Sequence, residues 1–240
     1  MSSEQLRVVR ARIRDFPDFP TAGVLFRLKL SWSLGQSNGD DKVAGLAGSA
    51  SFRALDISPL LKDPEAFRTA IDILETHVKD KHPQVDFIAG LDSRGFLFGP
   101  VLAQRLGVGF VLIRKKGKLP GRTESVSYTL EYGKACDFGD TELGLWIWSP
   151  LASCYLPIKQ DSFPALQAEL EVQGDAVEPS QKVILIDDLL ATGGTMRAAC
   201  ELMSKLKAEI LDCVVLIELK FLKGADMLKP FPLHSVLQYE

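Results

Sequence analysis

The sequence contains the stretch Val183-Ile184-Leu185-Ile186-Asp187-Asp188-Leu189-Leu190-Ala191-Thr192-Gly193-Gly194-Thr195. Its first four residues are apolar and predict a short buried strand that ends in two carboxylates. Small residues and two glycines follow, and the pattern from Thr195 to Leu206 predicts a helix. Glycines allow close approach of the backbone to a ligand, and successive N–H groups at a helix start bind phosphate. The stretch therefore predicts a phosphate-binding strand, turn and helix.

The acidic pair narrows the type of ligand. Asp187 and Asp188 would repel a phosphate unless they hold ribose hydroxyls, or a Mg²⁺ ion shared with a diphosphate. Thr192 and Thr195 add hydroxyl donors. A phosphorylated sugar therefore fits better than a nucleoside triphosphate, and the stretch has no Gly-Lys-Ser/Thr of a Walker-type loop. The alternative is a solvent-exposed turn with acidic caps.

Two further segments carry groups that bind anions. A predicted strand at residues 87–91 runs into Asp92-Ser93-Arg94-Gly95, and a helix is predicted from 96 to 106. Arg94 can bond a diphosphate in bidentate fashion while the N–H groups of Ser93 to Gly95 cradle it. A third strand, 108–113, precedes the basic run 114–118, which on its own is as well explained by a solvated loop. Ligands of parallel sheets bind at the carboxyl ends of strands, so we expect these segments to form one site.

Short apolar strands that alternate with helices predict an α/β fold with a mostly parallel twisted sheet flanked by helices. The other expected elements are an amphipathic helix over 4–16, a helix over 64–78 opened by Asp63 and Pro64, an exposed strand or mobile hairpin over 125–132, and a final core strand over 213–219.

Composition points to an ordinary globular protein. The 240 residues are 46% hydrophobic and 25% charged, with a net charge of −3, so no nucleic-acid partner is expected. No apolar core of a signal peptide and no apolar run of the ~20 residues of a membrane span are present, so we expect a cytoplasmic protein with no membrane partner. The four cysteines lack Cys-x-x-Cys spacing and partnered histidines, which favours free thiols over a zinc site.

The sequence resembles the purine and pyrimidine phosphoribosyltransferases, and within them the adenine phosphoribosyltransferases of animals. The resemblance covers residues 4–27, 56–135 and 168–240. The segments that carry it occur in the family's order: Phe16-Pro17-Asp18-Phe19-Pro20, Val24-Leu25-Phe26-Arg27, Asp56-Ile57-Ser58-Pro59, Gly90-Leu91-Asp92-Ser93-Arg94-Gly95-Phe96, Arg114-Lys115-Lys116-Gly117-Lys118-Leu119-Pro120-Gly121, Leu130-Glu131-Tyr132-Gly133-Lys134-Ala135, and residues 183–195.

The resemblance implies a type I phosphoribosyltransferase fold with a small hood from the N-terminal segment. It also implies transfer of the 5-phosphoribosyl group from phosphoribosyl diphosphate to adenine, giving AMP and diphosphate in purine salvage, with Mg²⁺ as cofactor and a homodimeric assembly. The implied ligands of phosphoribosyl diphosphate are Asp187 and Asp188 (ribose hydroxyls), Ala191, Thr192, Gly193, Gly194 and Thr195 (5′-phosphate), and Ser93, Arg94, Arg114 and Lys118 (diphosphate).

For the base and the closing loop, the resemblance implies that Leu25, Phe26 and Arg27 form the adenine pocket. It places Glu131 and Tyr132 on a loop that closes over the site. Arg94 would stabilise the leaving diphosphate, and Glu131 would act as acid or base at N7, although a solvated strand residue is the alternative. No side chain is assigned as a metal ligand, because Mg²⁺ is expected to be held through the diphosphate, near Asp187 and Asp188.

Two segments depart from the family's pattern. Residues 28–55 and 136–167 have no core-forming period, although the chain is expected to form a single domain over residues 1–240. We interpret them as atypical, poorly ordered insertions of intron-like sequence, from alternative splicing or an erroneous gene prediction. The alternative is a genuine regulatory or partner-binding insertion. Two other functions stay open: a catalytically impaired splice-type variant, and a non-catalytic phosphoribosyl-diphosphate-binding protein of the same fold.

Overall fold

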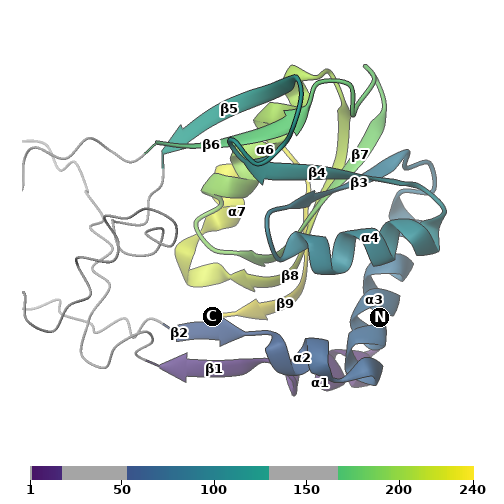
Figure 1. Ribbon diagram of the computed structural model, residues 1–240. Helices are drawn as coiled ribbons and strands as arrows, with labels where there is room; N and C mark the ends of the chain where they lie inside the picture. The colour runs from purple at the N-terminus through teal and green to yellow at the C-terminus, as the bar shows by residue number, and fades with distance from the viewer. Residues whose placement is uncertain (1, 18–52, 130–166) are drawn as a thin grey trace, which may run out of the picture.

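The computed structural model describes residues 2–17, 53–129 and 167–240 (Figure 1). Its main sheet has the strand order β5-β6-β4-β3-β7-β8-β9. The pairs β3–β4, β3–β7, β7–β8 and β8–β9 are parallel, whereas β4–β6 and β5–β6 are antiparallel. The strands are β3 (Phe87–Leu91), β4 (Gly109–Lys115), β5 (Thr123–Thr129), β6 (Gln167–Gln173), β7 (Lys182–Leu190), β8 (Glu209–Leu219) and β9 (Leu233–Tyr239).

Helices cover both faces of this sheet (Figure 1). Helices α1 (Ser3–Arg10), α3 (Pro64–Lys81) and α4 (Gly95–Leu106) pack on one face, and α6 (Gly194–Lys205) and α7 (Gly224–Leu228) on the other. The central strand β7 alternates between the two cores, because Ile184 and Ile186 join the first and Val183 and Leu185 the second. Two short helices, α2 (Ser58–Lys62) and η1 (Lys220–Leu222), complete the described helices.

The predicted α/β class and mostly parallel sheet are therefore confirmed. Two strand predictions were too short. The strand predicted from Val183 continues through the acidic pair to Leu190, and the strand predicted over 213–219 begins earlier, at Glu209. The latter strand is also not the final one, because β9 follows it. Residues 123–129 form strand β5, and the rest of the predicted 125–132 segment lies outside the described residues.

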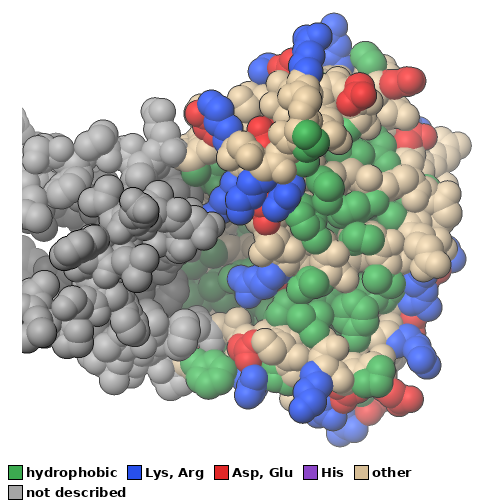
Figure 2. Space-filling view, in the orientation of Figure 1, with side chains coloured by type: hydrophobic (Ala, Val, Ile, Leu, Met, Phe, Trp, Pro, Cys, Tyr) green, Lys and Arg blue, Asp and Glu red, His purple; other side chains and the backbone are tan. Residues whose placement is uncertain are grey.

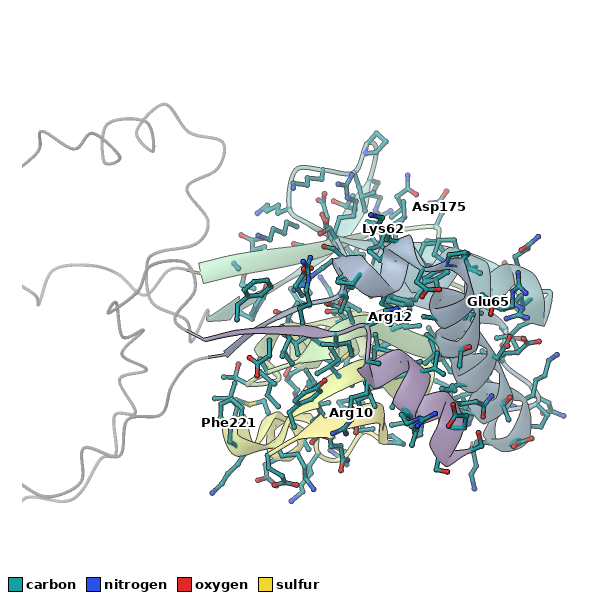
Figure 3. The ribbon with its side chains drawn as sticks, turned by 90° about the horizontal axis from the view of Figure 1, so that it is seen from below. Arg10, Arg12, Lys62, Glu65, Asp175 and Phe221 are labelled. Carbon is teal, nitrogen blue, oxygen red and sulfur yellow. The ribbon has the colours of Figure 1, made fainter. Side chains whose placement is uncertain are left out.

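The predicted helix over 4–16 is wrong beyond Arg10. The chain turns there and forms strand β1 (Arg14–Pro17), which pairs antiparallel with β2 (Arg53–Asp56) as a separate two-stranded sheet. Side chains at the end of α1 hold it to two other elements (Figure 3): Arg10 donates to the Gln238 carbonyl oxygen at 3.3 Å, and Arg12 bonds Asp63 at 2.8 Å. Tertiary pairing therefore overrides the local helical period.

Helix α3 begins as predicted. Asp63 is its N-cap and accepts hydrogen bonds from the backbone N–H groups of Glu65 and Ala66, and Pro64 occupies the first turn. The helix extends to Lys81, three residues beyond the predicted end. Its buried stripe supplies much of the first core.

The two insertions fall mainly outside the described residues. Of the residues assigned to them, 53–55 lie in β2 and Gln167 begins β6. Among the residues that the structure describes, no helix combines the length and apolar content of a membrane span.

Candidate active site

Two turns lie side by side at the carboxyl edge of the sheet. Strands β3 and β7 are parallel neighbours, with Gly90 in register with Ile186, so both end at the same edge. The first residue of α4 packs directly against β7, because a Cβ added at Gly95 would lie 2.5 Å from the Ile186 carbonyl oxygen. The expectation that the two turns meet is confirmed.

The acidic pair is largely withdrawn from water. Asp188 is 3% exposed, and its backbone N–H donates to the Asp187 carboxylate at 2.9 Å. Burial raises the pKa of Asp187 well above its ordinary value, and the neighbouring charge of Asp188 raises it further. Burial also raises the pKa of Asp188, against the opposing effect of Arg94. These carboxylates are therefore not caps of a solvent-exposed turn, and hydroxyl donors or a cation would stabilise their charge.

The glycine-rich turn places the start of α6 next to this pair. Gly193 is the N-cap of α6, with a φ of 91°, and no side chain caps the helix N–H groups. A Cβ at Gly193 would lie 2.6 Å from the Gly224 carbonyl oxygen, and a Cβ at Gly224 would collide with the Ala191 carbonyl oxygen. Helix α7 thus holds the turn by backbone contact. Ala191, Thr192, Gly194 and Thr195 are partly exposed around it.

A cationic cluster adjoins the acidic pair. Arg94 is exposed, and its guanidinium lies 3.1 Å from the Asp188 carboxylate, so it bridges the two turns. Arg114 donates through Nε to the Asp92 carboxylate at 3.2 Å, and Lys118 Nζ lies 3.9 Å from the same oxygen. Asp92 therefore collects two of the predicted diphosphate ligands, a role that the sequence did not reveal.

The turn between β3 and α4 carries two of the predicted diphosphate ligands, Ser93 and Arg94. Its Asp92–Ser93 peptide bond is cis, and both Ser93 and Arg94 are exposed. The structure thus brings the four predicted diphosphate ligands, Ser93, Arg94, Arg114 and Lys118, to one edge of the sheet.

Glu171, on β6, binds the backbone of the basic loop that follows β4 (residues 116–119). It is 4% exposed, and its Oε1 accepts the backbone N–H groups of Lys118 and Leu119, both at 2.8 Å. Burial opposes the charge of Glu171, but the backbone N–H bonds from Leu119, Gly117 and Lys118 outweigh it and lower its pKa. The alternation of apolar and acidic residues over 168–171 could have predicted on which face of the strand Glu171 lies. It could not have predicted that Glu171 contacts the basic loop.

The remaining predicted site residues lie outside the described residues. They are the adenine-pocket residues Leu25, Phe26 and Arg27 and the closing-loop residues Glu131 and Tyr132.

The described groups suit one chemical task. Uncapped helix N–H groups and a glycine turn can hold a terminal phosphate, buried carboxylates can accept from hydroxyls, and adjacent guanidinium and ammonium groups can hold a second phosphate unit. A sugar phosphorylated at both ends matches this order along the sheet edge.

Comparison with known proteins agrees with this geometry. The family described as "Phosphoribosyl transferase domain" matches residues 56–229. Adenine phosphoribosyltransferases of Rattus norvegicus and Homo sapiens are 50% and 48% identical over 241 residues, with 100% of each chain covered.

Solved structures give the same result. The adenine phosphoribosyltransferase of Saccharomyces cerevisiae, solved with an iminoaltritol bisphosphate and adenine, has a TM-score of 0.70 at 29% identity and covers 98% of this chain and 100% of its own. That of Thermoanaerobacter pseudethanolicus has a TM-score of 0.68 at 32% identity, covering 98% and 99%. The chain therefore has the type I phosphoribosyltransferase fold and belongs to the phosphoribosyltransferase family, within its adenine phosphoribosyltransferase members.

Proposed function

We propose that this chain transfers the 5-phosphoribosyl group from phosphoribosyl diphosphate to adenine, giving AMP and diphosphate in purine salvage. One observation carries the proposal: the buried acidic pair and the start of α6 lie directly beside the cations gathered on Asp92 and Asp188. The choice of adenine is supported by relatives that bear this activity in their names, and by the yeast structure solved with adenine.

In the proposed reaction, the turn from Ala191 to Thr195 binds the 5′-phosphate, and Asp187 and Asp188 accept hydrogen bonds from the ribose hydroxyls. The bond between the anomeric carbon and the diphosphate breaks as adenine N9 attacks. Positive charge develops on the ribose, and negative charge on the leaving diphosphate. Arg94, Arg114 and Lys118 stabilise that negative charge, because each can turn from its carboxylate partner to the phosphate oxygens.

Mg²⁺ is the proposed cofactor, and the donor set fits it. Mg²⁺ binds through one or two carboxylates together with substrate phosphate oxygens, and Asp187 and Asp188 offer two adjacent carboxylates, of which Asp188 is 3% exposed. The ion would be held through the diphosphate, near these two residues. When bound, it supplies charge neutralisation for the leaving group.

The base and proton-transfer roles rest on residues beyond the described part of the chain. Leu25, Phe26 and Arg27 are proposed to form the adenine pocket. Glu131, with Tyr132 on the closing loop, is proposed to exchange a proton with N7 of the base, for which its pKa must lie near neutrality.

A homodimer is the proposed assembly. Hydrophobic side chains gather over α4 and the neighbouring strand β4 (Figure 2), where Leu97, Val101 and Leu112 are 40%, 36% and 38% exposed. A second copy of the chain would cover such a patch. The proposed compartment is the cytoplasm, which suits the buried free thiols of Cys200 and Cys213.

The test is AMP formation from adenine and phosphoribosyl diphosphate with Mg²⁺, measured beside Glu131→Gln and Asp188→Asn variants. We expect AMP from the wild type, much slower transfer by Glu131→Gln, and weaker binding of phosphoribosyl diphosphate by Asp188→Asn. Binding without AMP formation by the wild type would overturn the proposal in favour of a non-catalytic binding protein or an impaired variant. Sedimentation of the wild type beside Leu97→Glu tests the homodimer.

A further inference from the structure

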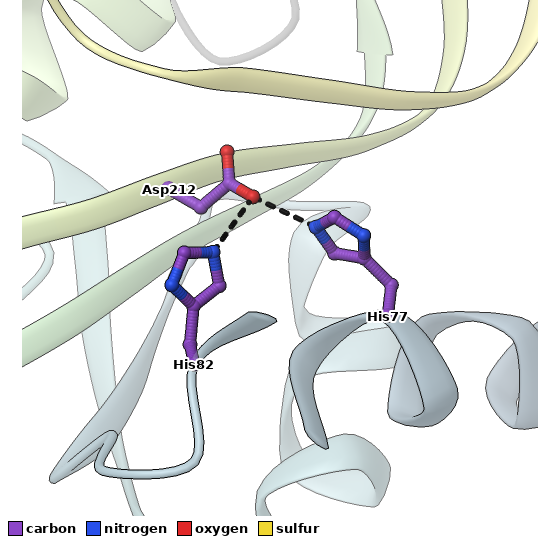
Figure 4. A group of neighbouring side chains, drawn as sticks. All are labelled: His77, His82 and Asp212. Carbon is purple, nitrogen blue, oxygen red and sulfur yellow. Dashed lines mark hydrogen bonds and ion pairs between the residues drawn. The ribbon is translucent and has the colours of Figure 1, made fainter. Parts of the chain in front are cut away.

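All three histidines of the chain lie in one cluster, away from the candidate active site. His77 projects from α3, His82 is the C-cap residue that ends α3, and His234 lies on β9. The first two meet Asp212, near the start of β8 (Figure 4). Because the active-site turns follow the carboxyl ends of the strands, the cluster lies toward the opposite edge of the sheet.

Three ligand atoms converge in this cluster. Asp212 Oδ2 lies 2.8 Å from His77 Nε2 and 3.2 Å from His82 Nε2, and the three atoms lie within 4.8 Å of one another. Tetrahedral zinc with nitrogen and oxygen ligands near 2.0–2.2 Å requires ligand atoms separated by about 3.3 Å. The two separations from Asp212 Oδ2 lie close to this value, and the two imidazole nitrogens are at most 4.8 Å apart. Two histidines separated by four residues also have the spacing common in zinc sites.

Asp212 is a buried carboxylate with few partners. Its side chain is 5% exposed, and among the described residues its ion-pair partners are the two histidines alone. Its second oxygen, Oδ1, is buried and has no hydrogen-bond partner among them. A buried carboxylate is costly without a compensating positive charge, which a bound cation would supply.

The geometry points to a structural zinc site formed by His77, His82 and Asp212, and we propose that it binds one Zn²⁺ per chain. The ion would join the end of α3 to the start of β8. The rings of His77 and His82 are 15% and 19% exposed, so solvent can reach a fourth coordination position. Imidazole nitrogens select Zn²⁺ over Mg²⁺, so this ion differs from the one proposed for the active site.

His234 supports the cluster without being a ligand. Its ring stacks on that of His77 with centroids 3.6 Å apart and planes 9° apart, which fixes the orientation of the His77 ring. Another aromatic ring at this position could keep the stacking contact with His77.

The test is a Zn²⁺ titration of the full chain after treatment with a chelator, followed by calorimetry and thermal unfolding. Excess Mg²⁺ is present throughout so that the carboxylates of the active site are occupied. The double variant His77→Gln with His82→Gln is compared with the wild type, and His234→Phe is the matched control. We expect the double variant to lose one equivalent of Zn²⁺ and the rise in melting temperature that Zn²⁺ produces in the wild type.

The single variant His82→Gln controls for misfolding of the double variant, because it changes only one partly exposed side chain at the end of a helix. It should weaken Zn²⁺ binding by more than the roughly 10- to 100-fold cost of losing an outer-shell partner, while AMP formation stays at the wild-type rate. His234→Phe should retain the wild-type stoichiometry. Equal stoichiometry in the double variant and the wild type, or no Zn²⁺ bound by the wild type, would overturn the proposal.

Discussion

Glu171 offers a sharp test of how the basic loop is held. Replacing it with glutamine keeps the shape and an acceptor for the N–H groups of Lys118 and Leu119, but removes the charge. Hydrogen bonds to charged groups contribute roughly 1.5–3 kcal/mol and neutral ones about 0.5–1.5 kcal/mol. Two bonds to this buried carboxylate therefore lose ~2 kcal/mol together in Glu171→Gln.

This loss should appear in substrate binding. If the free energy that holds Lys118 and its loop in place falls by ~2 kcal/mol, at 1.4 kcal/mol for each tenfold, the KM for phosphoribosyl diphosphate should rise by roughly 10- to 30-fold. The kcat should change less, because the loop binds the substrate and the leaving group alike. The assay is the initial rate of AMP formation across phosphoribosyl diphosphate concentrations.

The matched control is Glu169→Gln on the same strand. The Glu169 side chain is 29% exposed and pairs with Lys116 at 2.6 Å, an ion pair near the surface that contributes little. We expect its KM to stay close to that of the wild type. An unchanged KM in Glu171→Gln, or equal changes in the two variants, would refute the anchoring role.

Three further predictions follow from the same contacts. Gly224→Ala should slow transfer by on the order of 100-fold, because the added Cβ would displace the proposed phosphate-binding turn. The control Gly109→Ala, where the nearest atom to an added Cβ is 3.7 Å away, should have wild-type kinetics. Equal rates in the two variants would contradict the role of the contact between Gly224 and the turn. Arg94→Ala should lower kcat/KM by roughly 10²–10³-fold with little change in melting temperature. The control Arg122→Ala, which replaces a side chain that is 89% exposed, should change neither quantity. Steady-state kinetics and thermal unfolding of the two variants measure these effects. Because the pKa of Glu171 is lowered in the folded protein, the charge of Glu171 contributes its full stabilisation above the pKa of an unfolded glutamate, about 4.3. This stabilisation is lost as pH falls through the lower pKa of the folded state. The acid unfolding curves of the wild type and Glu171→Gln should therefore converge only below ~pH 4.

Local chemistry in the sequence was enough to predict the main elements and the glycine-rich turn between β7 and α6. Apolar runs predicted β3, β7 and β8, because a buried strand needs continuous apolar residues, and Asp63 with Pro64 marked the start of α3. An apolar run also predicted β4, although Ile113 is the one buried residue of that strand. The helix predicted over 4–16 failed because pairing of β1 with β2 depends on residues far along the chain.

The sequence by itself determined that an acidic pair, two glycines and a helix start would lie together, since all of these belong to one continuous stretch, and from this it predicted an anion site. Only the tertiary structure decided which groups surround that site. Asp92, Glu171 and Gly224 act through contacts with loops distant in sequence, and the convergence of His77, His82 and Asp212 arises from the packing of α3 on β8. Such contacts depend on which strand edges and helix faces meet, and no local pattern encodes that proximity.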